Sequence, residues 1–230
     1  MPNERVLGVD ACKAGWVGVT LTGRVTNAYF APKISELVEL VESDGAVAVI
    51  AVDMPIGLPD REHRKADELA YREIGVLRSS VFMTPTREAL ERTNHAAASA
   101  RNRELTGTGI SVQAFGLRTK LREVDEWVQQ GGRQIIEVHP EVSFAVLAGE
   151  PLTASKKTWA GAERRRRLLA DHGIVLDGDL GEAGRRAAVD DVLDAAVAAW
   201  TASRHHRGKA RPLPDPPERF SDGLLSAIWS

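Results

Sequence analysis

The sequence predicts one α/β domain in which helices flank a mixed sheet of five strands. Three observations indicate this fold class. Short β-branched or aromatic runs separated by glycines open the chain. Apolar residues at helical spacing follow at 34–41, and the continuously apolar run 46–52 is typical of a strand buried on both faces. With 230 residues, 43% of them hydrophobic, the chain can bury a sizeable core.

The expected elements alternate at first and then become mostly helical. Strands are expected at residues 6–9, 16–21 and 25–30 as an antiparallel meander, then at 46–52 and 135–139. Helices are expected at residues 34–41, 66–77, 86–103, 112–128, 140–147, 159–172 and 185–204. Residues 60–130, rich in Arg, Glu and Ala, would form a helical insertion after the fourth strand of the single domain 1–230. The closing RPLPDPPERF and GLLSAIW predict a strap over the surface.

Composition narrows the classes of protein. The formal net charge of -2 provides no global basic field, so a nucleic-acid partner would need a local patch. Cys12 is the single cysteine, which allows no internal disulfide and fits a reducing compartment. Because no apolar window approaches the length of a membrane span, we expect a cytoplasmic protein without membrane association. Dimerisation through the apolar GLLSAIW segment stays open.

The stretch DDVLDAAVAAW, residues 190–200, places acidic residues in an otherwise apolar helix. Bulky apolar residues line one side, and alanines with Asp191 and Asp194 line the other. A helix that is apolar on both sides is expected to be buried, and its alanines permit close approach to a sheet. Buried carboxylates require protons or cations. Helix capping would explain Asp190 and could also explain Asp191, but it leaves Asp194 unexplained.

Further acidic residues stand where predicted strands end. Asp10 closes the first strand in VLGVDACKAGWVGV, Asp53 closes the fourth in VAVIAVDMPIGLP, and Glu137 lies near the end of the fifth in QIIEVHPE. Open α/β sheets bind ligands at the carboxyl ends of their strands. Each residue alone could be a turn former, whereas together with the late helix they predict one acidic site.

These motifs resemble a known family. The strand order, an Asp on the first strand, an acidic residue on the fourth and D-x-x-D-A on a late helix resemble the ribonuclease H-like nuclease superfamily, which includes Holliday-junction resolvases. Within it, GVDACKAGWV, DMPIGLP, SSVFMTP, EVHPEVSF, KKTWAG and DDVLDAAVAAW resemble an uncharacterised family of predicted nucleases over nearly the whole chain. The resemblance implies a ribonuclease H-like sheet and a divalent-metal-dependent nuclease.

The resemblance also assigns roles to residues. Asp10 would bridge two divalent ions, Asp53 would be the ligand on the adjacent strand, and Asp191 with Asp194 would be the helix ligands. Oxygen-only sites suit Mg²⁺ or Mn²⁺, and two such ions roughly 4 Å apart can activate water and stabilise the leaving oxygen of a phosphodiester. Glu137 would be a fifth ligand, a base or a structural residue.

Basic residues are candidates for substrate contacts. Lys13 follows Asp10 and could touch a phosphate, and Lys156 and Lys157 before TWAG suggest the same. A local basic patch could be formed by Arg78, Arg87, Arg118 and Lys120. Each of these side chains could equally be solvated on a helix face or loop, and the run Arg164 to Arg167 is expected to be an exposed helix face.

Three other side chains remain open. His139 could be a general acid or base, although a histidine at a strand-to-helix turn is more often structural. Trp16 and Trp159 are expected in the core or in a lid, with base stacking as the minor alternative.

Two other classes of function are kept beside the nuclease. GVDACKAG also resembles the phosphate-binding hairpin of actin-like and sugar-kinase ATPases, which need two such domains, and Cys12 and Lys13 depart from its pattern. A ribonuclease H-like binding module without turnover is the third. The preferred hypothesis is hydrolysis of a nucleic acid or small nucleotide, with a small or single-stranded substrate favoured because of the low positive charge.

Overall fold

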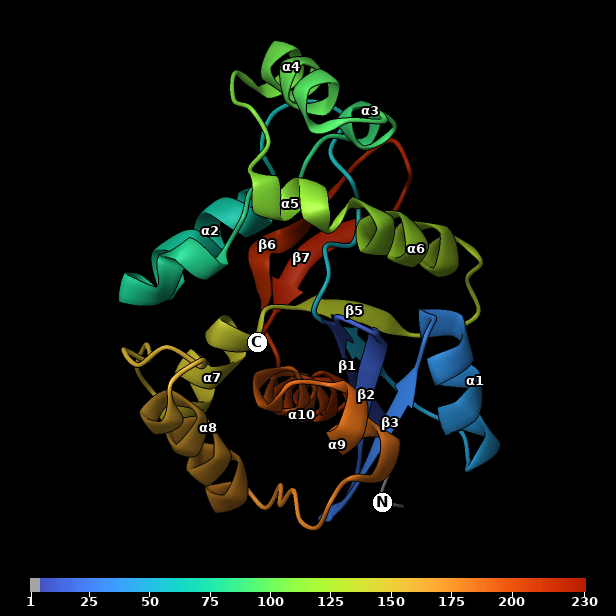
Figure 1. The fold of residues 1–230 in the computed structure, drawn as a ribbon, viewed down its shortest axis with the longest axis vertical. Coiled ribbons are helices and arrows are strands. Elements are labelled where there is room, and N and C mark those ends of the chain that lie inside the picture. The colour runs from blue at the N-terminus through green and yellow to red at the C-terminus, as the bar shows by residue number, and fades with distance from the viewer. Residues whose placement is uncertain (1–4) are drawn as a thin grey trace.

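The computed structural model describes residues 5–230 and shows one seven-stranded sheet flanked by helices (Figure 1). The strands are β1 (Val6–Cys12), β2 (Gly15–Thr22), β3 (Val25–Ala31), β4 (Ile50–Val52), β5 (Ile135–Val138), β6 (Pro212–Arg219) and β7 (Leu225–Trp229). Their order across the sheet is β3-β2-β1-β4-β5-β7-β6. The sheet is mixed: β1, β2 and β3 form an antiparallel meander, β1, β4, β5 and β7 run parallel, and β6 is antiparallel to β7.

Helices cover both faces of the sheet. They are α1 (Ile34–Ser43), α2 (Lys65–Glu73), the 3-10 helix η1 (Gly75–Ser80), α3 (Arg87–Leu90), α4 (His95–Thr106), α5 (Val112–Gly116), α6 (Arg118–Gln129), α7 (Pro140–Ala148), α8 (Trp159–Asp171), α9 (Gly181–Arg186) and α10 (Val189–His206). One core lies between the sheet and α7, α8 and α10, and the other lies between the sheet and α1 and α6. Of the helices within residues 5–230, none combines the length and the apolar character needed to cross a membrane.

The packing of α10 against β1 explains why this helix is rich in alanine. A Cβ atom at Gly8 would lie 2.1 Å from both the carbonyl oxygen of Ala195 and the amide nitrogen of Ala199. The two backbones therefore touch, and only small residues fit between them. Residues Ala195, Ala196, Ala198 and Ala199 are all fully buried. The predicted close approach of the alanine face to a sheet is confirmed.

Helices α2 to α6 and η1 all lie between β4 and β5 in the chain, and they form the upper part of the molecule in Figure 1. Part of this segment has its own small core, built from Ala89, Ala98, Ile110 and Ala114. Because β4 and β5 are adjacent in the sheet, the segment leaves and re-enters at neighbouring strands. Because these two strands are parallel, the segment returns to β5 at the opposite edge from the end of β4, and its helix α6 packs on the same face of the sheet as α1.

The end of the chain differs from the prediction. The proline-rich segment is not a strap, because β6 and β7 extend the sheet from five strands to seven. Prolines cannot donate backbone hydrogen bonds, but β6 is an edge strand, where this loss is tolerated. The GLLSAIW segment supplies β7, whose Ser226, Ala227 and Ile228 are buried between β5 and β6. These three residues are thus packed within the chain, whereas Leu225 of the same segment is 55% exposed.

Candidate metal centre

Three carboxylates from separate elements meet at one edge of the sheet. Asp10 lies near the end of β1, Asp53 directly follows β4, and Asp194 lies in the second turn of α10. One oxygen from each side chain lies within 4.8 Å of the others. Asp10 is 6% exposed and Asp194 is 0% exposed, while Asp53 is partly exposed. These residues could hold a metal ion.

Local structure explains this convergence. In the parallel β1–β4 pair, Val9 is opposite Val52, and the amide of Asp53 donates to the carbonyl of Val9 over 2.9 Å. Asp10 and Asp53 therefore leave the sheet side by side. Asp194 immediately precedes Ala195, whose carbonyl lies against Gly8 of β1, so the close helix contact also fixes the position of the third carboxylate.

Burial and repulsion from other carboxylates raise the pKa values of all three carboxyl groups above their usual range. Burial, with repulsion from Asp53 and Asp194, raises the pKa of Asp10 well above its usual value. Burial and repulsion from Asp194 raise the pKa of Asp53 to about 8, and burial raises that of Asp194 to about 6 even though Lys156 opposes the shift. The Oδ1 atom of Asp194 is buried and has no hydrogen-bond partner among the described residues. Buried carboxylates are costly to ionise without a partner, so a nearby positive charge would stabilise their ionised form.

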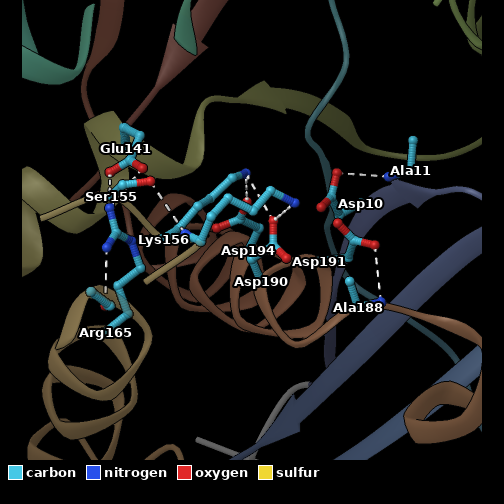
Figure 2. A network of polar contacts seen from close by, with 12 residues as sticks. Asp10, Ala11, Glu141, Ser155, Lys156, Arg165, Ala188, Asp190, Asp191 and Asp194 are labelled. Carbon is cyan, nitrogen blue, oxygen red and sulfur yellow. Dashed lines mark hydrogen bonds and ion pairs between the residues drawn. The ribbon is translucent and has the colours of Figure 1, made fainter. Parts of the chain in front are cut away.

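Two lysines supply part of that charge. Figure 2 shows Lys156 reaching from its loop to Asp194 on α10, where its Nζ donates to Oδ2. The same Nζ lies 4.0 Å from Asp190 Oδ2, while Lys157 forms an ion pair with Asp190. Burial lowers the pKa of Lys156, but the carboxylates of Asp194, Asp53 and Asp10 outweigh this, so its net pKa is raised. The Lys156 side chain therefore stays charged.

The loop that carries Lys156 is held in place by hydrogen bonds from Arg165 of α8. This arginine is 0% exposed, and its Nη2 donates to both carboxylate oxygens of Glu141 over 2.7 and 2.6 Å. Its Nη1 donates to the carbonyls of Ala154 and Gly161 over 3.0 Å (Figure 2 shows Arg165 with Glu141). The prediction that 164–167 is wholly exposed is wrong at Arg165. Its i, i+3 and i+4 spacing to the buried Leu168 and Leu169 could have revealed this.

A family model described as "Protein of unknown function (DUF429)" matches residues 8–219. The chain belongs to this family. The DUF429 match spans all three carboxylates and both lysines of the site. None of the curated proteins and none of the solved structures compared with the chain matches it.

Asp191 does not join the three carboxylates of this DUF429 chain. It is half-buried at the rim of the site, where its Oδ2 accepts a hydrogen bond of 3.1 Å from the amide of Ala188. This contact caps α10, so the capping interpretation applies to Asp191. Asp190 instead is buried and paired with Lys157. The i, i+3 spacing predicts that Asp191 and Asp194 point to the same side of α10. In the structure, the hydrogen bond from the amide of Ala188 keeps the Asp191 carboxylate at the first turn of the helix.

Glu137 has a partner that the sequence analysis missed. Both of its carboxylate oxygens accept from Nη2 of Arg64, over 2.7 and 2.6 Å, and Oε2 also accepts from the amide of Ile56. Arg64 is 0% exposed and lies 3.7 Å from Asp67. Burial raises the pKa of Glu137 to about 7 against the opposing effect of Arg64. Of the alternatives stated for Glu137, these contacts match the structural one.

The expected basic patch is largely occupied by contacts inside the DUF429 chain. Arg87 forms ion pairs with Asp125 (2.6 Å) and Asp222 (2.7 Å), which are both nearly buried. The other cations lie over aromatic rings: Arg78 over Tyr71, Arg118 over Phe115 and Lys120 over Trp16. Lys13 is exposed in the turn between β1 and β2. Of these cations, Arg87 is thus paired with carboxylates, and Arg78, Arg118 and Lys120 pack on rings of the same chain.

Trp16, Trp159 and His139 differ in their exposure and in their position relative to the site. Trp16 is 0% exposed and its Nε1 donates to Glu123 over 2.9 Å, so it belongs to the core. Trp159 is 82% exposed at the start of α8. His139 lies beside the site, where burial and the charge of Lys156 lower its pKa to about 4. It is therefore a neutral imidazole at physiological pH.

A cavity of about 420 Å³ opens over the carboxylates. Its lining includes the carboxylates Asp10, Asp53, Asp190 and Asp191 and the lysines Lys156 and Lys157. Side chains of the segment between β4 and β5 complete the lining, among them Phe82, Gln113 and Leu117. The lining of the cavity therefore combines carboxylates and lysines with apolar and uncharged polar side chains.

Proposed function

We propose that this DUF429 protein hydrolyses phosphodiester bonds with the help of a divalent metal ion, Mg²⁺ or Mn²⁺. The observation that carries the proposal is the meeting of Asp10, Asp53 and Asp194 within 4.8 Å of one another at a cavity. Oxygen-only donor sets suit these hard ions. The unpartnered Oδ1 of the fully buried Asp194 fits such a ligand, because a buried carboxylate oxygen without a partner is costly.

The residues divide the work between them. Asp10, Asp53 and Asp194 would hold the ion, which when bound supplies Lewis-acid activation of a phosphoryl oxygen and of water. Lys157, whose side chain is 68% exposed beside Asp190, would attract the phosphate at the rim. The neutral His139 in the cavity lining offers a hydrogen bond without adding charge.

We further propose that the first five strands and α10 form a ribonuclease H-like core. Its support is the order β3-β2-β1-β4-β5, with an antiparallel meander followed by parallel strands. The acidic residues lie on the first strand, after the fourth strand and on the late helix. This is the arrangement on which the resemblance to that superfamily rests.

The surroundings of the site favour a small or single-stranded substrate. A volume of about 420 Å³ falls in the range of small-molecule pockets, and the segment between β4 and β5 closes one side. Duplex binding draws on many free phosphate-contacting cations. Here Arg87 is held by Asp125 and Asp222, and Arg118 and Lys120 cover aromatic rings.

Hydrolysis of three phosphodiesters tests the proposal: bis(p-nitrophenyl) phosphate, a single-stranded oligonucleotide and the duplex of the same sequence, each with Mn²⁺ and with EDTA. We expect Mn²⁺-dependent cleavage by the wild type, faster on the single strand than on the duplex. Asp53→Asn should abolish it, and the matched control Asp171→Asn, at an exposed position ending α8, should retain it. No Mn²⁺-dependent cleavage of any substrate, or cleavage that survives in Asp53→Asn, would refute the function.

A further inference from the structure

The position of Lys156 bears on how many metal ions the site can hold. Its Nζ donates to Oδ2 of Asp194, so one of the two oxygens of that carboxylate is already paired with a positive charge. The other oxygen, Oδ1, is buried and has no hydrogen-bond partner among residues 5–230. Asp194 therefore uses one oxygen for the ammonium group of Lys156 and has a second oxygen that can bind a cation.

Lys156 is built into this position by its loop. Arg165 is fully buried, and it donates over 3.0 Å to the carbonyl of Ala154, which lies two residues before Lys156 in the chain. The hydroxyl of Thr158 donates to the carbonyl of Ser155 over 2.8 Å, and a Cβ atom at Gly161 would lie 2.0 Å from the same carbonyl oxygen. The two residues before Lys156 are thus held against α8, and Thr158, the N-cap of that helix, follows two residues after it, unlike the setting of a freely moving surface lysine.

The charges of the three ligand carboxylates and Lys156 also match a single ion. Asp10, Asp53 and Asp194 with Lys156 leave two negative charges, which one divalent ion cancels. Asp190 is balanced by Lys157. Asp191 adds a further negative charge at the rim, where its Oδ2 accepts from the amide of Ala188 at the start of α10.

We propose that this centre works with one divalent ion and with the ammonium group of Lys156 in place of a second. The inference rests on the proposed function and revises the two ions that the family resemblance implied. Lys156 stays on Asp194 Oδ2 while the ion takes Asp10, Asp53 and Asp194 Oδ1. The lysine then supplies, beside the ion, positive charge that a second ion would otherwise bring.

The test counts Mn²⁺ ions bound per chain, from the free Mn²⁺ signal in electron paramagnetic resonance during titration. The wild type should bind one ion. Lys156→Met keeps an unbranched side chain that is one atom shorter but removes its charge, and it should bind a second ion or bind the first at least tenfold more tightly. Lys156→Arg retains the charge and should bind one. Lys209→Met, at an exposed lysine after α10, is the matched control and should behave as the wild type.

The outcomes separate the inference from the function on which it rests. Two ions bound by the wild type would overturn the single-ion inference and leave the metal-dependent function standing. Unchanged stoichiometry and affinity in a folded Lys156→Met variant would overturn it as well. No Mn²⁺ bound by the wild type would overturn the proposed function itself, and the inference with it. Circular dichroism of each variant establishes that the bound ions are counted on folded protein.

Discussion

Replacing Asp10 by Asn should stabilise the metal-free protein, although the residue lies at the centre of the site. The ligand oxygens of Asp10, Asp53 and Asp194 lie within 4.8 Å of one another. Two unit charges at that separation repel by about 3.5 kcal/mol at an effective dielectric constant of about 20. Asparagine keeps the oxygen that accepts from the amide of Ala11 over 2.7 Å but removes the charge.

The net gain is smaller than the bare repulsion. Lys156 offsets part of the negative charge, and proton uptake by Asp53, whose pKa is raised to about 8, limits the cost further. We expect Asp10→Asn to gain about 1–2 kcal/mol at pH 8, which corresponds to roughly 2–8 °C in Tm for a chain of this size.

Thermal unfolding in EDTA measures the stability of the metal-free protein, and thermal unfolding in Mn²⁺ measures the stabilisation by the bound ion. In EDTA the variant should melt above the wild type, while the exposed control Asp171→Asn should melt with it. Adding Mn²⁺ should raise the Tm of the wild type and leave that of Asp10→Asn nearly unchanged, because ligand binding stabilises only the form that binds. A variant less stable than the wild type in EDTA, or an equal Mn²⁺ response in both proteins, would refute the reasoning.

Three further predictions follow from the packing and the buried charges. Gly8→Ala places a methyl group 2.1 Å from the backbone of α10 and should cost about 3 kcal/mol in urea unfolding; a loss below about 1 kcal/mol would contradict the close contact. Glu137→Gln removes the bidentate partner of the buried Arg64 and leaves it only Asp67 at 3.7 Å, so it should cost about 3 kcal/mol, while the folded variant still binds Mn²⁺; lost Mn²⁺ binding at unchanged stability would instead make Glu137 a ligand. Above about pH 7, where ordinary histidines are neutral, the raised pKa values of Asp10 and Asp53 mean that the folded state holds protons that the unfolded state has released. The Tm in EDTA should therefore fall from pH 7 to pH 8.5, and a flat or rising Tm would show that these carboxylates are already ionised.

Local sequence patterns were sufficient to find the centre of the fold and of the site. Asp10 and Asp53 end apolar strand runs, and the apolar face around Asp194 has helical periodicity, so each signal lies within about ten residues of the carboxylate. Because parallel strands end at the same edge of a sheet, strand order was enough to bring the first two together. The structure adds the contact of Gly8 with α10, which positions the third.

Pairs formed over long distances in the chain could not be predicted in the same way. Arg64 and Glu137 are 73 positions apart, and no periodicity links them. The edge strand β6 was missed because its prolines favour a loop locally, and only its pairing with β7 makes it a strand. Asp191 and Asp194 have the same residue type and lie on one side of α10. They differ because Asp191 lies in the first turn, where its carboxylate can accept from the backbone amide of Ala188, and this depends on the residue at which the helix begins.

Anomalous scattering from crystals grown with Mn²⁺ would test the central claim most directly, because it locates the ion without relying on a substrate. The account predicts an anomalous peak within coordination distance of Asp10, Asp53 and Asp194, with Lys156 still paired to Asp194 and the peak lost in Asp53→Asn crystals. Saturating Mn²⁺ with no peak at these carboxylates would contradict the assignment of a metal centre and the hydrolase function built on it.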